Sequence, residues 1–394
     1  MREGTMAAGE RIKVAHLLTK PELGGAQANT LYTVRHLDRT RFYPSLVTSP
    51  DGELAGDMAC IQDAQVAFVP DLVREIRPLR DGRAACELVK VIRSIGPRIV
   101  HTHSSKAGIL GRWAARRAGV PLVIHTVHGF PFHDHQRLAR KTFYVALERM
   151  ASRLTDRFVC VSRADMTKGE AYHVFDSERV ELIRSGISLE DYRRAAGTGM
   201  GLRGELGIPR TAPLAGMVAC FKPQKDPLTF VRAAAQVARR VSAARFLMVG
   251  DGELRGAVQR VRAEEGLGDR LVVTGWRRDI PRVMDALNVC VLTSLHEGLP
   301  RVVPEAMACA RPVVATAVDG TPEAVSEGRT GYLVPPGDIQ RTAARVSELL
   351  LDPDRARRMG EEAARRVGEF DIDRMVQRQE QMYLDLMARH GINA

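Results

Sequence analysis

The segment HEGLPRVVPE contains the two side chains of this sequence that are best placed for chemistry, Glu297 and Glu305. A helix is expected over about 300–310, which puts Glu297 in the loop before it and Glu305 more than one turn inside it. Two carboxylates at these places can accept hydrogen bonds from different hydroxyl-bearing parts of one extended ligand. The amides of Gly298 and Leu299, near the helix start, would favour anionic groups of that ligand. Solvated glutamates are the plainer interpretation, but the apolar neighbours make this a poor place for an idle carboxylate.

Two lysines lie at the start of another helix in the same half of the chain. Lys222 and Lys225 belong to the segment MVACFKPQKDPLTF, which follows a strand-like run and opens a helix. Two cations and a helix N-terminus can therefore meet on one side of a phosphate group. The segments VGDGELR and RLVVTGW repeat the order of a strand followed by a glycine turn. Their strand ends offer Gly250, Gly252 and Trp276 as further groups that could contact a ligand.

A glycine pair and a set of histidines mark the strand ends of the first half. Gly24 and Gly25 follow the run RIKVAHLLT and precede a helix, so a ligand could approach the backbone there. This loop does not read G-x-G-x-x-G, the dinucleotide fingerprint, and a tight structural turn is an equally good interpretation of the glycine pair. His128 ends the strand PLVIHTVHG, where a neutral imidazole can donate a hydrogen bond into a cleft. The same region receives further histidines: His101, His103, His125, His133 and His135.

These residues fall on loops because the chain alternates short apolar runs with stretches of helical spacing. The alternation is typical of β-α-β units and parallel sheets, in which ligands bind outside the carboxyl ends of the strands. A glycine-rich stretch at 193–210 interrupts the pattern and is expected to be a linker with a short helix. We therefore expect an α/β protein with two doubly wound, Rossmann-like domains at 1–195 and 196–371. The last segment, 372–394, is expected to form an amphipathic helix that returns to the N-terminal domain.

Length and charge fit two globular domains with one basic surface. A chain of 394 residues exceeds what one hydrophobic core usually serves. The formal net charge is +11, and residues 82–153 hold thirteen Lys or Arg against three acids. Such a surplus can attract nucleic acid, an anionic membrane or a phosphorylated substrate, or it can be solvated helix faces. Because Trp113, Phe143 and Tyr144 are interleaved with it, we expect an anionic membrane surface and no nucleic-acid partner.

Cysteine usage and hydropathy indicate a cytoplasmic protein. The six cysteines form no C-x-x-C pair and are expected to be reduced, buried thiols. No apolar stretch is long enough for a membrane-spanning helix, and no apolar run precedes the first strand. We expect the protein to be cytoplasmic, with a peripheral position at the inner face of the plasma membrane. The sequence does not indicate an oligomeric state.

Several motifs, taken in order along the chain, resemble those of the retaining glycosyltransferases of family four, also described as glycosyl transferases group 1. They are the Gly-Gly loop, IVHTH, TVHG, RSGIS, PQK, GDGELR, HEGLPRVVPE and DGTPE, and they span nearly the whole chain. The resemblance implies the GT-B architecture, with two Rossmann-like domains facing across a cleft. The first would hold the acceptor and the second a nucleotide sugar. The implied reaction transfers a hexose, from a UDP-sugar by family frequency, to a hydroxyl of a glycan or lipid-linked acceptor in cell-surface polysaccharide or glycolipid synthesis.

The resemblance also implies roles for single residues. Lys225 resembles the lysine that binds the donor diphosphate. Glu297 resembles the carboxylate that binds hydroxyls of the transferred sugar, and Glu305 the one that binds the ribose. His128 resembles the histidine that touches the sugar from the first domain, and Gly25 belongs to the loop nearest the diphosphate and the acceptor.

Two segments depart from the family pattern. Ala219, Cys220 and Phe221 stand where the family usually has Gly-Arg-Leu, so the phosphate-binding arginine is missing and Lys222 is the candidate to replace it. The family's Asn-Gly-Ile-Asp is Ser-Gly-Ile-Ser at 185–188.

The expected chemistry needs neither a cofactor nor a metal. The D-x-D strings at 352–354 and 371–373 have the character of turn or terminal-helix residues, and no carboxylate or cysteine accompanies the histidines at metal-ligand spacing. Positive groups and helix N-termini would stabilise the leaving diphosphate, and domain closure would hold the acceptor. No carboxylate is placed as a covalent nucleophile. Internal return, in which the departing phosphate oxygen takes the acceptor proton, is therefore the simplest mechanism.

Three other functions would fit parts of the pattern. A sugar-nucleotide epimerase of the same architecture would bind a nucleotide diphosphate but release nucleotide without needing an acceptor. A nicotinamide-dependent oxidoreductase would need the glycine spacing that neither GGAQAN nor GDGEL has. A non-enzymatic protein of the membrane surface would use the basic region and would not need Glu297 or Glu305.

Overall fold

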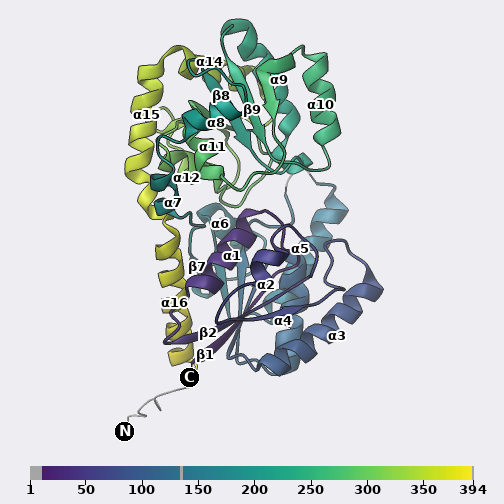
Figure 1. Cartoon of the computed structure of the whole chain (residues 1–394). Coiled ribbons are helices and arrows are strands. Elements are labelled where there is room, and N and C mark those ends of the chain that lie inside the picture. Colours follow the sequence, from purple (N-terminus) through teal and green to yellow (C-terminus); the bar gives the residue numbers. More distant parts are fainter. Residues whose placement is uncertain (1–10, 134–135, 393–394) are drawn as a thin grey trace. The chain divides into compact units, whose positions relative to one another are not determined.

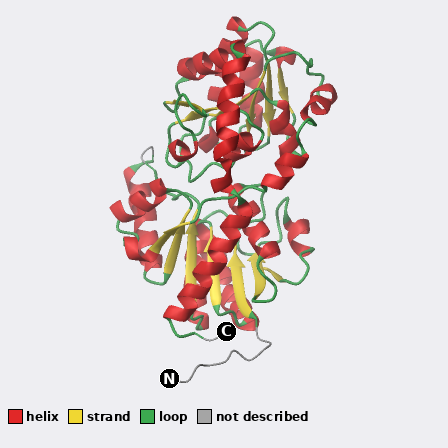
Figure 2. Ribbon diagram, turned by 90° about the vertical axis from the view of Figure 1, so that its left-hand side faces the viewer, coloured by secondary structure: helices red, strands yellow, loops and turns green. Residues whose placement is uncertain are grey.

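The computed structural model describes residues 11–133 and 136–392 and separates the chain into two compact units (Figure 1). The N-terminal unit extends to Ser185 and takes up the chain again from Ile372, whereas the C-terminal unit is Gly186–Asp371. Figure 2 shows the strands of each unit lying between layers of helices. The chain is therefore an α/β protein built from two Rossmann-like units, as the alternating pattern predicts.

The described part of the N-terminal unit has a seven-stranded parallel sheet in the order β3-β2-β1-β4-β5-β6-β7. Aliphatic and β-branched runs form its buried central strands, because helices cover both faces of a parallel sheet. The strands are β1 Ile12–Leu17, β2 Phe42–Thr48, β3 Gln65–Phe68, β4 Ile99–His103, β5 Leu122–Val127, β6 Arg157–Cys160 and β7 Val180–Leu182. The helices are α1 Gly25–His36, α2 Ala55–Ala59, α3 Pro78–Ile95, α4 Ser105–Ala118, α5 Leu138–Ser152, α6 Arg163–Ala171 and α16 Ile372–Arg389.

Side chains alternate between the two faces along each strand, so the core residues of this sheet pack against two different helix layers. On one face, Ala15 and Val100 pack in a cluster with apolar side chains of α3 and α4. On the other face, Val14 and Ile124 pack in a cluster with α16, whose Tyr383 is completely buried. The helix α16 thus completes the core of the N-terminal unit, although the chain reaches it only after the C-terminal unit.

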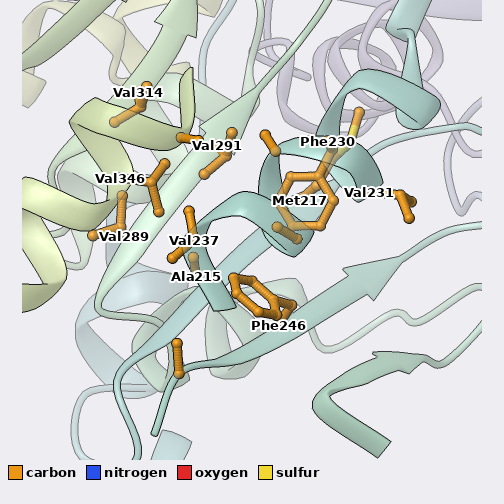
Figure 3. Close-up of a cluster of buried hydrophobic side chains, with 14 of the residues drawn as sticks. Ala215, Met217, Phe230, Val231, Val237, Phe246, Val289, Val291, Val314 and Val346 are labelled. Carbon is orange, nitrogen blue, oxygen red and sulfur yellow. The ribbon is translucent and has the colours of Figure 1, made fainter. Parts of the chain in front are cut away.

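The described part of the C-terminal unit has a six-stranded parallel sheet in the order β10-β9-β8-β11-β12-β13. Its core joins apolar strand residues such as Met217 and Phe246 to Phe230 of α9 (Figure 3). The strands are β8 Leu214–Val218, β9 Arg245–Val249, β10 Leu271–Val273, β11 Val289–Leu292, β12 Val313–Thr316 and β13 Gly331–Val334. The helices are α7 Leu189–Arg194, α8 Gly199–Glu205, α9 Pro227–Arg240, α10 Arg255–Glu264, α11 Ile280–Ala286, α12 Val302–Ala308, α13 Thr321–Ala324, α14 Ile339–Leu351 and α15 Pro353–Arg366.

The glycine-rich stretch at 193–210 is packed structure and differs from the expected linker. Its helix α8 packs on α11, and a Cβ atom added to Gly199 would lie 2.3 Å from the backbone nitrogen of Ala286. Arg203 is buried and donates hydrogen bonds to the carbonyl oxygen of Ala286. The glycine therefore permits close packing of two helices. The boundary between the units accordingly lies after Ser185, earlier than the expected boundary after residue 195.

The cysteines differ in burial, and the expectation of buried thiols is confirmed for only two of the six, because Cys220 and Cys309 are partly exposed and two others are exposed. Cys160 and Cys290 are buried in strands, whereas Cys60 and Cys86 are exposed. Cys86 lies off the buried stripe of α3, and Cys60 follows the short helix α2. Among the described residues, no helix has both the length and the apolar character needed to cross a bilayer.

Candidate functional site

The strand order of each sheet reverses direction at one place. The strand ends there lead into Gly24 and Gly25 in the N-terminal unit and into Lys222, Lys225 and Glu297 in the C-terminal unit. In the N-terminal unit the chain runs outward from β1 to β2 and β3, then returns to β4 on the other side of β1 and continues outward to β7. In the C-terminal unit β8 and β11 have the same relation. Ligands of doubly wound sheets bind outside the carboxyl ends of the strands at such switch points. The loops after β1, β4, β8 and β11 are therefore the places to look for binding groups.

A buried ion pair joins the loops that follow β8 and β11. The Lys225 ammonium contacts the Glu297 carboxylate, and Ser294 Oγ donates a 2.6 Å hydrogen bond to the same carboxylate oxygen. The side chains are only 19% and 7% exposed, so the carboxylate is held where solvent screens it little. The idle-glutamate interpretation is therefore incompatible with the position of Glu297.

Hydrogen bonds between the two loops position this pair. The backbone of Gln224 accepts from the amide of Leu295 over 2.8 Å, and its side chain donates to the carbonyl of His296 over 2.9 Å. Thr293 Oγ1 lies 3.1 Å from the carbonyl oxygen of Lys225 and 2.8 Å from that of Asp226. The segment PQK is thus tied to the segment SLHE, and Lys225 and Glu297 are brought together by the neighbouring backbone.

A third loop, after β12, supports the same glutamate. Asp319 accepts a 2.8 Å hydrogen bond from the amide of Glu297, and the amide of Gly320 donates a 3.0 Å bond to the carbonyl of Gly298. Gly298 and Leu299 are buried in this turn. The motif DGTPE therefore has a structural role, because it holds the loop that carries Glu297.

Glu305 lies in the first turn of α12, and the expectation of a position more than one turn inside the helix is wrong. The helix starts at Val302, and the amide of Glu305 donates its helical hydrogen bond to the carbonyl of Arg301. Pro304 explains the late start, because proline has no N–H and is tolerated only in the first turn of a helix. Glu305 is consequently nearer the start of the helix than the expected helix over 300–310 places it.

Tyr192, which the sequence pattern did not single out, is the partner of Glu305. Its side chain is 5% exposed, and its hydroxyl forms a hydrogen bond with the Glu305 carboxylate. Arg301 lies 3.7 Å from the same carboxylate. Burial raises the pKa of Glu305, and the charge of Arg301 and the hydrogen bond of Tyr192 oppose that rise. The motif RSGIS leads directly into α7, which carries Tyr192, and this adjacency was the available signal.

The glycines after β9 are needed for close approach of backbones. Gly250 has φ 137°, and a Cβ atom there would lie 1.9 Å from the carbonyl oxygen of Ala219. Gly252 has φ 149°, with the Phe221 carbonyl oxygen 2.7 Å from the position of a Cβ atom. The loop after β9 therefore packs on the loop that carries the lysines.

Two other predicted residues of this unit lie at its strand ends. Lys222 is half-buried at the start of the short 3-10 turn Pro223–Lys225. Trp276 follows Gly275, whose carbonyl accepts a 2.8 Å hydrogen bond from the amide of Gly250, and its ring is 39% exposed. All of the predicted residues of the C-terminal unit thus lie on loops, or in the first turn of a helix, after strands of one sheet.

The Gly-Gly loop belongs to the N-terminal unit. Gly24 is the N-cap of α1 and Gly25 its first residue, so the pair lies where the loop after β1 enters the helix. Gln27 donates a 3.2 Å hydrogen bond to the carbonyl of Lys20 and closes this loop on itself. Free helical N–H groups at this end can face an anion.

The histidines of this unit divide between the two faces of the sheet. His16 pairs in register with His101, and both point to the face covered by α16, where His103 also lies. His128 follows β5 and joins them, with its Nε2 3.2 Å from Nδ1 of His103. His125 points to the opposite face, because it alternates with its neighbours along β5 and bonds Thr102. The histidines of this region thus lie on both faces of the sheet, with His101 and His103 on one face, and His135 lies outside the described residues.

Burial keeps these imidazoles neutral. It lowers the pKa of His16 to about 3 and that of His128 to about 4, and it holds the pKa of His103 well below its usual value. A cavity of about 10 Å³, enough for one water molecule, lies between His103, His128 and Asn29 of α1. Asn29 is 3% exposed, and its side-chain amide has no partner among the described residues.

Three histidines could also hold a metal ion. His16, His101 and His103 each bring one ring nitrogen within 4.8 Å of the others. Both nitrogens of His101 are engaged, however, each 2.6 Å from a hydroxyl, one of Tyr383 and one of Thr126. A metal at this place would have to replace one of these hydrogen bonds. The expectation that no metal is needed stays a prediction.

Comparison with known proteins gives two family matches that follow one another along the chain. Residues 23–191 match the model described as Glycosyltransferase Family 4, and residues 212–352 match that described as Glycosyl transferases group 1. A relative from Escherichia coli, UDP-Gal:alpha-D-GlcNAc-diphosphoundecaprenol alpha-1,3-galactosyltransferase, is 35% identical over 84% of this chain and 85% of its own. A D-inositol 3-phosphate glycosyltransferase from Segniliparus rotundus is 29% identical over 69% of this chain and 62% of its own.

Solved structures share the fold at lower identity. The Anabaena protein HepE in complex with UDP-glucose superimposes with a TM-score of 0.82 and 22% identity, over 95% of this chain and all of that one. Sucrose-phosphate synthase from Thermosynechococcus elongatus has a TM-score of 0.83 and 23% identity, over 96% of this chain and all of that one. The family matches, the relatives and the fold agree with one another. The chain belongs to glycosyltransferase family 4, the glycosyl transferases of group 1, and has the GT-B fold.

Proposed function

We propose that this protein is a retaining hexosyltransferase that moves a sugar from a UDP-sugar to a hydroxyl of a lipid-linked glycan. The observation that carries the proposal is the Lys225–Glu297 pair, held by three loops at the switch point between β8 and β11. A cation and a carboxylate so placed can bind a diphosphate and the hydroxyls of the sugar attached to it. The family membership makes nucleotide-sugar transfer the reaction that such a pair serves.

The donor would be bound mainly by strand-end groups of the C-terminal unit. Lys225 binds the diphosphate, with Lys222 in the place of the missing arginine. Glu297 accepts hydrogen bonds from the transferred sugar, and Glu305, oriented by Tyr192, accepts them from the ribose. The turns at Gly250 and Gly252 let backbone approach the nucleotide, while Gly298 and Leu299 offer amides to its phosphates. Backbone groups beside Trp276 would form hydrogen bonds with the edge of the nucleobase.

Catalysis would follow from stabilising the leaving group. The lysines neutralise charge that develops on the diphosphate as the glycosidic bond breaks. Neutral His128 donates a hydrogen bond to the sugar, and Gly24 and Gly25 allow the acceptor and diphosphate to approach the backbone of α1. The phosphate oxygen that departs would take the acceptor proton on the same face of the sugar, which retains the configuration. No cofactor or metal takes part in this scheme, because protein cations supply the positive charge.

The acceptor is proposed to be lipid-linked and reached at a membrane surface. The E. coli relative acts, by its name, on GlcNAc-diphosphoundecaprenol. The helices α3, α4 and α5, which pack side by side, carry exposed apolar side chains among the basic residues of 82–153. These side chains are Leu79, Trp113, Leu138, Phe143 and Met150. Apolar side chains among cations are typical of peripheral attachment to anionic lipid, which here would be the inner face of the plasma membrane.

The test is nucleotide release with and without acceptor. Purified protein is first screened with UDP, GDP and ADP by thermal shift, and UDP at 100 times its Kd should stabilise the fold by about 2.7 kcal/mol. UDP-galactose and UDP-glucose are then supplied with GlcNAc-diphosphoundecaprenol. UDP should be released only with the acceptor, and the new linkage should keep the anomeric configuration of the donor. Turnover of the nucleotide sugar without acceptor would favour the epimerase, and no turnover with any donor would refute the proposal.

A further inference from the structure

Three histidines form a continuous hydrogen-bonded chain that ends at the proposed substrate contact. Nδ1 of His16 lies 3.1 Å from Nε2 of His103, and Nδ1 of His103 lies 3.2 Å from Nε2 of His128. His16 is completely buried, His103 is 3% exposed, and His128 is half-buried. The chain therefore runs from the interior of the sheet to the strand end beyond β5.

A neutral imidazole has one N–H and one bare nitrogen, so the protons of this chain are coupled. If His16 donates from Nδ1, then His103 accepts at Nε2, donates from Nδ1, and leaves His128 with its proton on Nδ1. If His128 donates from Nε2, every proton moves to the other nitrogen, and Nδ1 of His128 becomes an acceptor. Only these two arrangements satisfy both contacts. The tautomer of His128 is thus set by His16, at the other end of the three hydrogen-bonded histidines.

The surroundings of His16 favour the first arrangement. Nε2 of His16 is buried and has no hydrogen-bond partner among the described residues. In the first arrangement this atom is a bare acceptor, and in the second it is an N–H donor. Buried N–H groups without a partner are rarer in proteins than unsatisfied acceptors. The cavity beside His103 and His128 is not lined by His16 and so offers this nitrogen no water.

We propose that His16 and His103 are positioning residues that hold His128 with its proton on Nδ1, so that Nδ1 is a fixed hydrogen-bond donor toward the substrate. Nδ1 of His128 has no partner among the described residues and is free to take this part. An isolated neutral histidine side chain carries its proton mainly on Nε2. The hydrogen bonds among the three histidines would therefore impose the less common tautomer on His128. The link to the substrate rests on the proposed function, whereas the tautomer itself does not.

The decisive experiment is NMR of the full chain labelled with ¹³C and ¹⁵N in histidine. Nitrogen shifts and one-bond carbon couplings distinguish a protonated from a bare ring nitrogen at neutral pH, and single variants assign the signals. We expect His16, His103 and His128 all to carry the proton on Nδ1. A proton on Nε2 of His128, or an average of the two forms, would overturn the proposal without any need for an active enzyme.

A variant pair tests whether His103 sets the tautomer. His103→Leu removes the donor to His128 and should release its proton to both nitrogens. If Nδ1–H of His128 contributes one hydrogen bond, kcat/KM for the sugar donor should fall about threefold to tenfold. His103→Asn places an amide near the position of Nδ1 and should restore much of both signals. His125→Asn, on the other face of the same sheet, is the matched control and should leave the tautomer of His128 unchanged.

The outcomes separate this inference from the proposed function. If His103→Leu is folded by thermal melting and His128 keeps a pure Nδ1–H form, His103 does not set the tautomer and the proposal fails. If His103→Leu does not fold, the spectrum of the natural protein still decides. A natural protein with the expected tautomer but no transferase activity refutes the proposed function and leaves the histidine chain intact.

Discussion

The two glutamates should fail in different ways when they are removed, and their surroundings set the size of each effect. Glu305→Ala removes the proposed acceptor for the ribose hydroxyls, a contact present with nucleotide alone. A hydrogen bond to a charged group contributes about 1.5–3 kcal/mol, so the Kd for UDP should rise about tenfold to a hundredfold. Calorimetry with UDP measures this directly. Because the ribose is common to UDP and the UDP-sugar, both ligands should lose affinity to the same degree.

The contact with Tyr192 adds a stability effect that must be separated from binding. Glu305→Ala leaves the buried Tyr192 hydroxyl without its partner, which costs about 1–3 kcal/mol of unfolding free energy. The double variant Tyr192→Phe, Glu305→Ala removes both groups and should recover part of the stability without recovering UDP affinity. Denaturant unfolding of the single and double variants measures this difference. A double variant that binds UDP normally would show that the single variant weakens binding only by misfolding the site.

Glu297→Ala should leave UDP binding intact or strengthen it. In the free protein the Glu297 carboxylate neutralises Lys225, so removing it releases a cation for the diphosphate. The loss should appear in turnover, where about a hundredfold lower kcat is typical for a lost electrostatic contact to the reacting group. Steady-state rates and calorimetry on the same sample decide. Equal loss of UDP affinity in the two variants would refute this division of labour, and full activity of both would refute the glycosyltransferase mechanism itself.

Four further predictions concern the metal, the membrane, acid stability and a glycine. Activity should survive excess chelator; loss that is restored by Mn²⁺ or Mg²⁺ would contradict the metal-free scheme. Binding to anionic vesicles should weaken as salt rises and also in Trp113→Ser with Phe143→Ser, measured by co-sedimentation, and no binding at low salt would indicate a soluble acceptor. Burial lowers the pKa of histidines such as His16 in the folded protein, so they stay neutral, whereas the histidines of the unfolded chain take up protons below about pH 6.5. The protein therefore has its full stability above that pH and loses stability below it. The slope is up to about 1.4 kcal/mol per pH unit for each such residue, and in denaturant titrations His16→Phe should flatten it. Gly250→Ala should destabilise the protein by at least roughly 1–3 kcal/mol through backbone strain alone. The control Gly256→Ala, which adds a methyl group in open space on α10, should be neutral or stabilising. Similar melting temperatures of the two variants would contradict the close approach of Gly250 to Ala219.

The local pattern was sufficient for the elements and for the loops that carry the site. Periods of two and of about 3.6 residues depend on near neighbours along the chain, so the strand and helix alternation and the amphipathic α16 could be read directly. The position of Glu297 after a strand followed in the same way. The position of Glu305 within α12 did not, because it depends on where Pro304 lets the helix start, and the apolar spacing does not contain that restriction.

The partners of those residues were decided only by the tertiary structure. Nothing local to β1 or β4 indicates that they lie side by side, and that pairing is what brings His16 beside His101 and into hydrogen-bonding distance of His103. The contact of Tyr192 with Glu305 likewise joins residues far apart in the sequence. Such contacts form because the whole unit must bury its apolar surface at once, a condition that no single segment contains. The sequence by itself thus determined which loops carry the chemistry, and the strand order determined which side chains act on one another there.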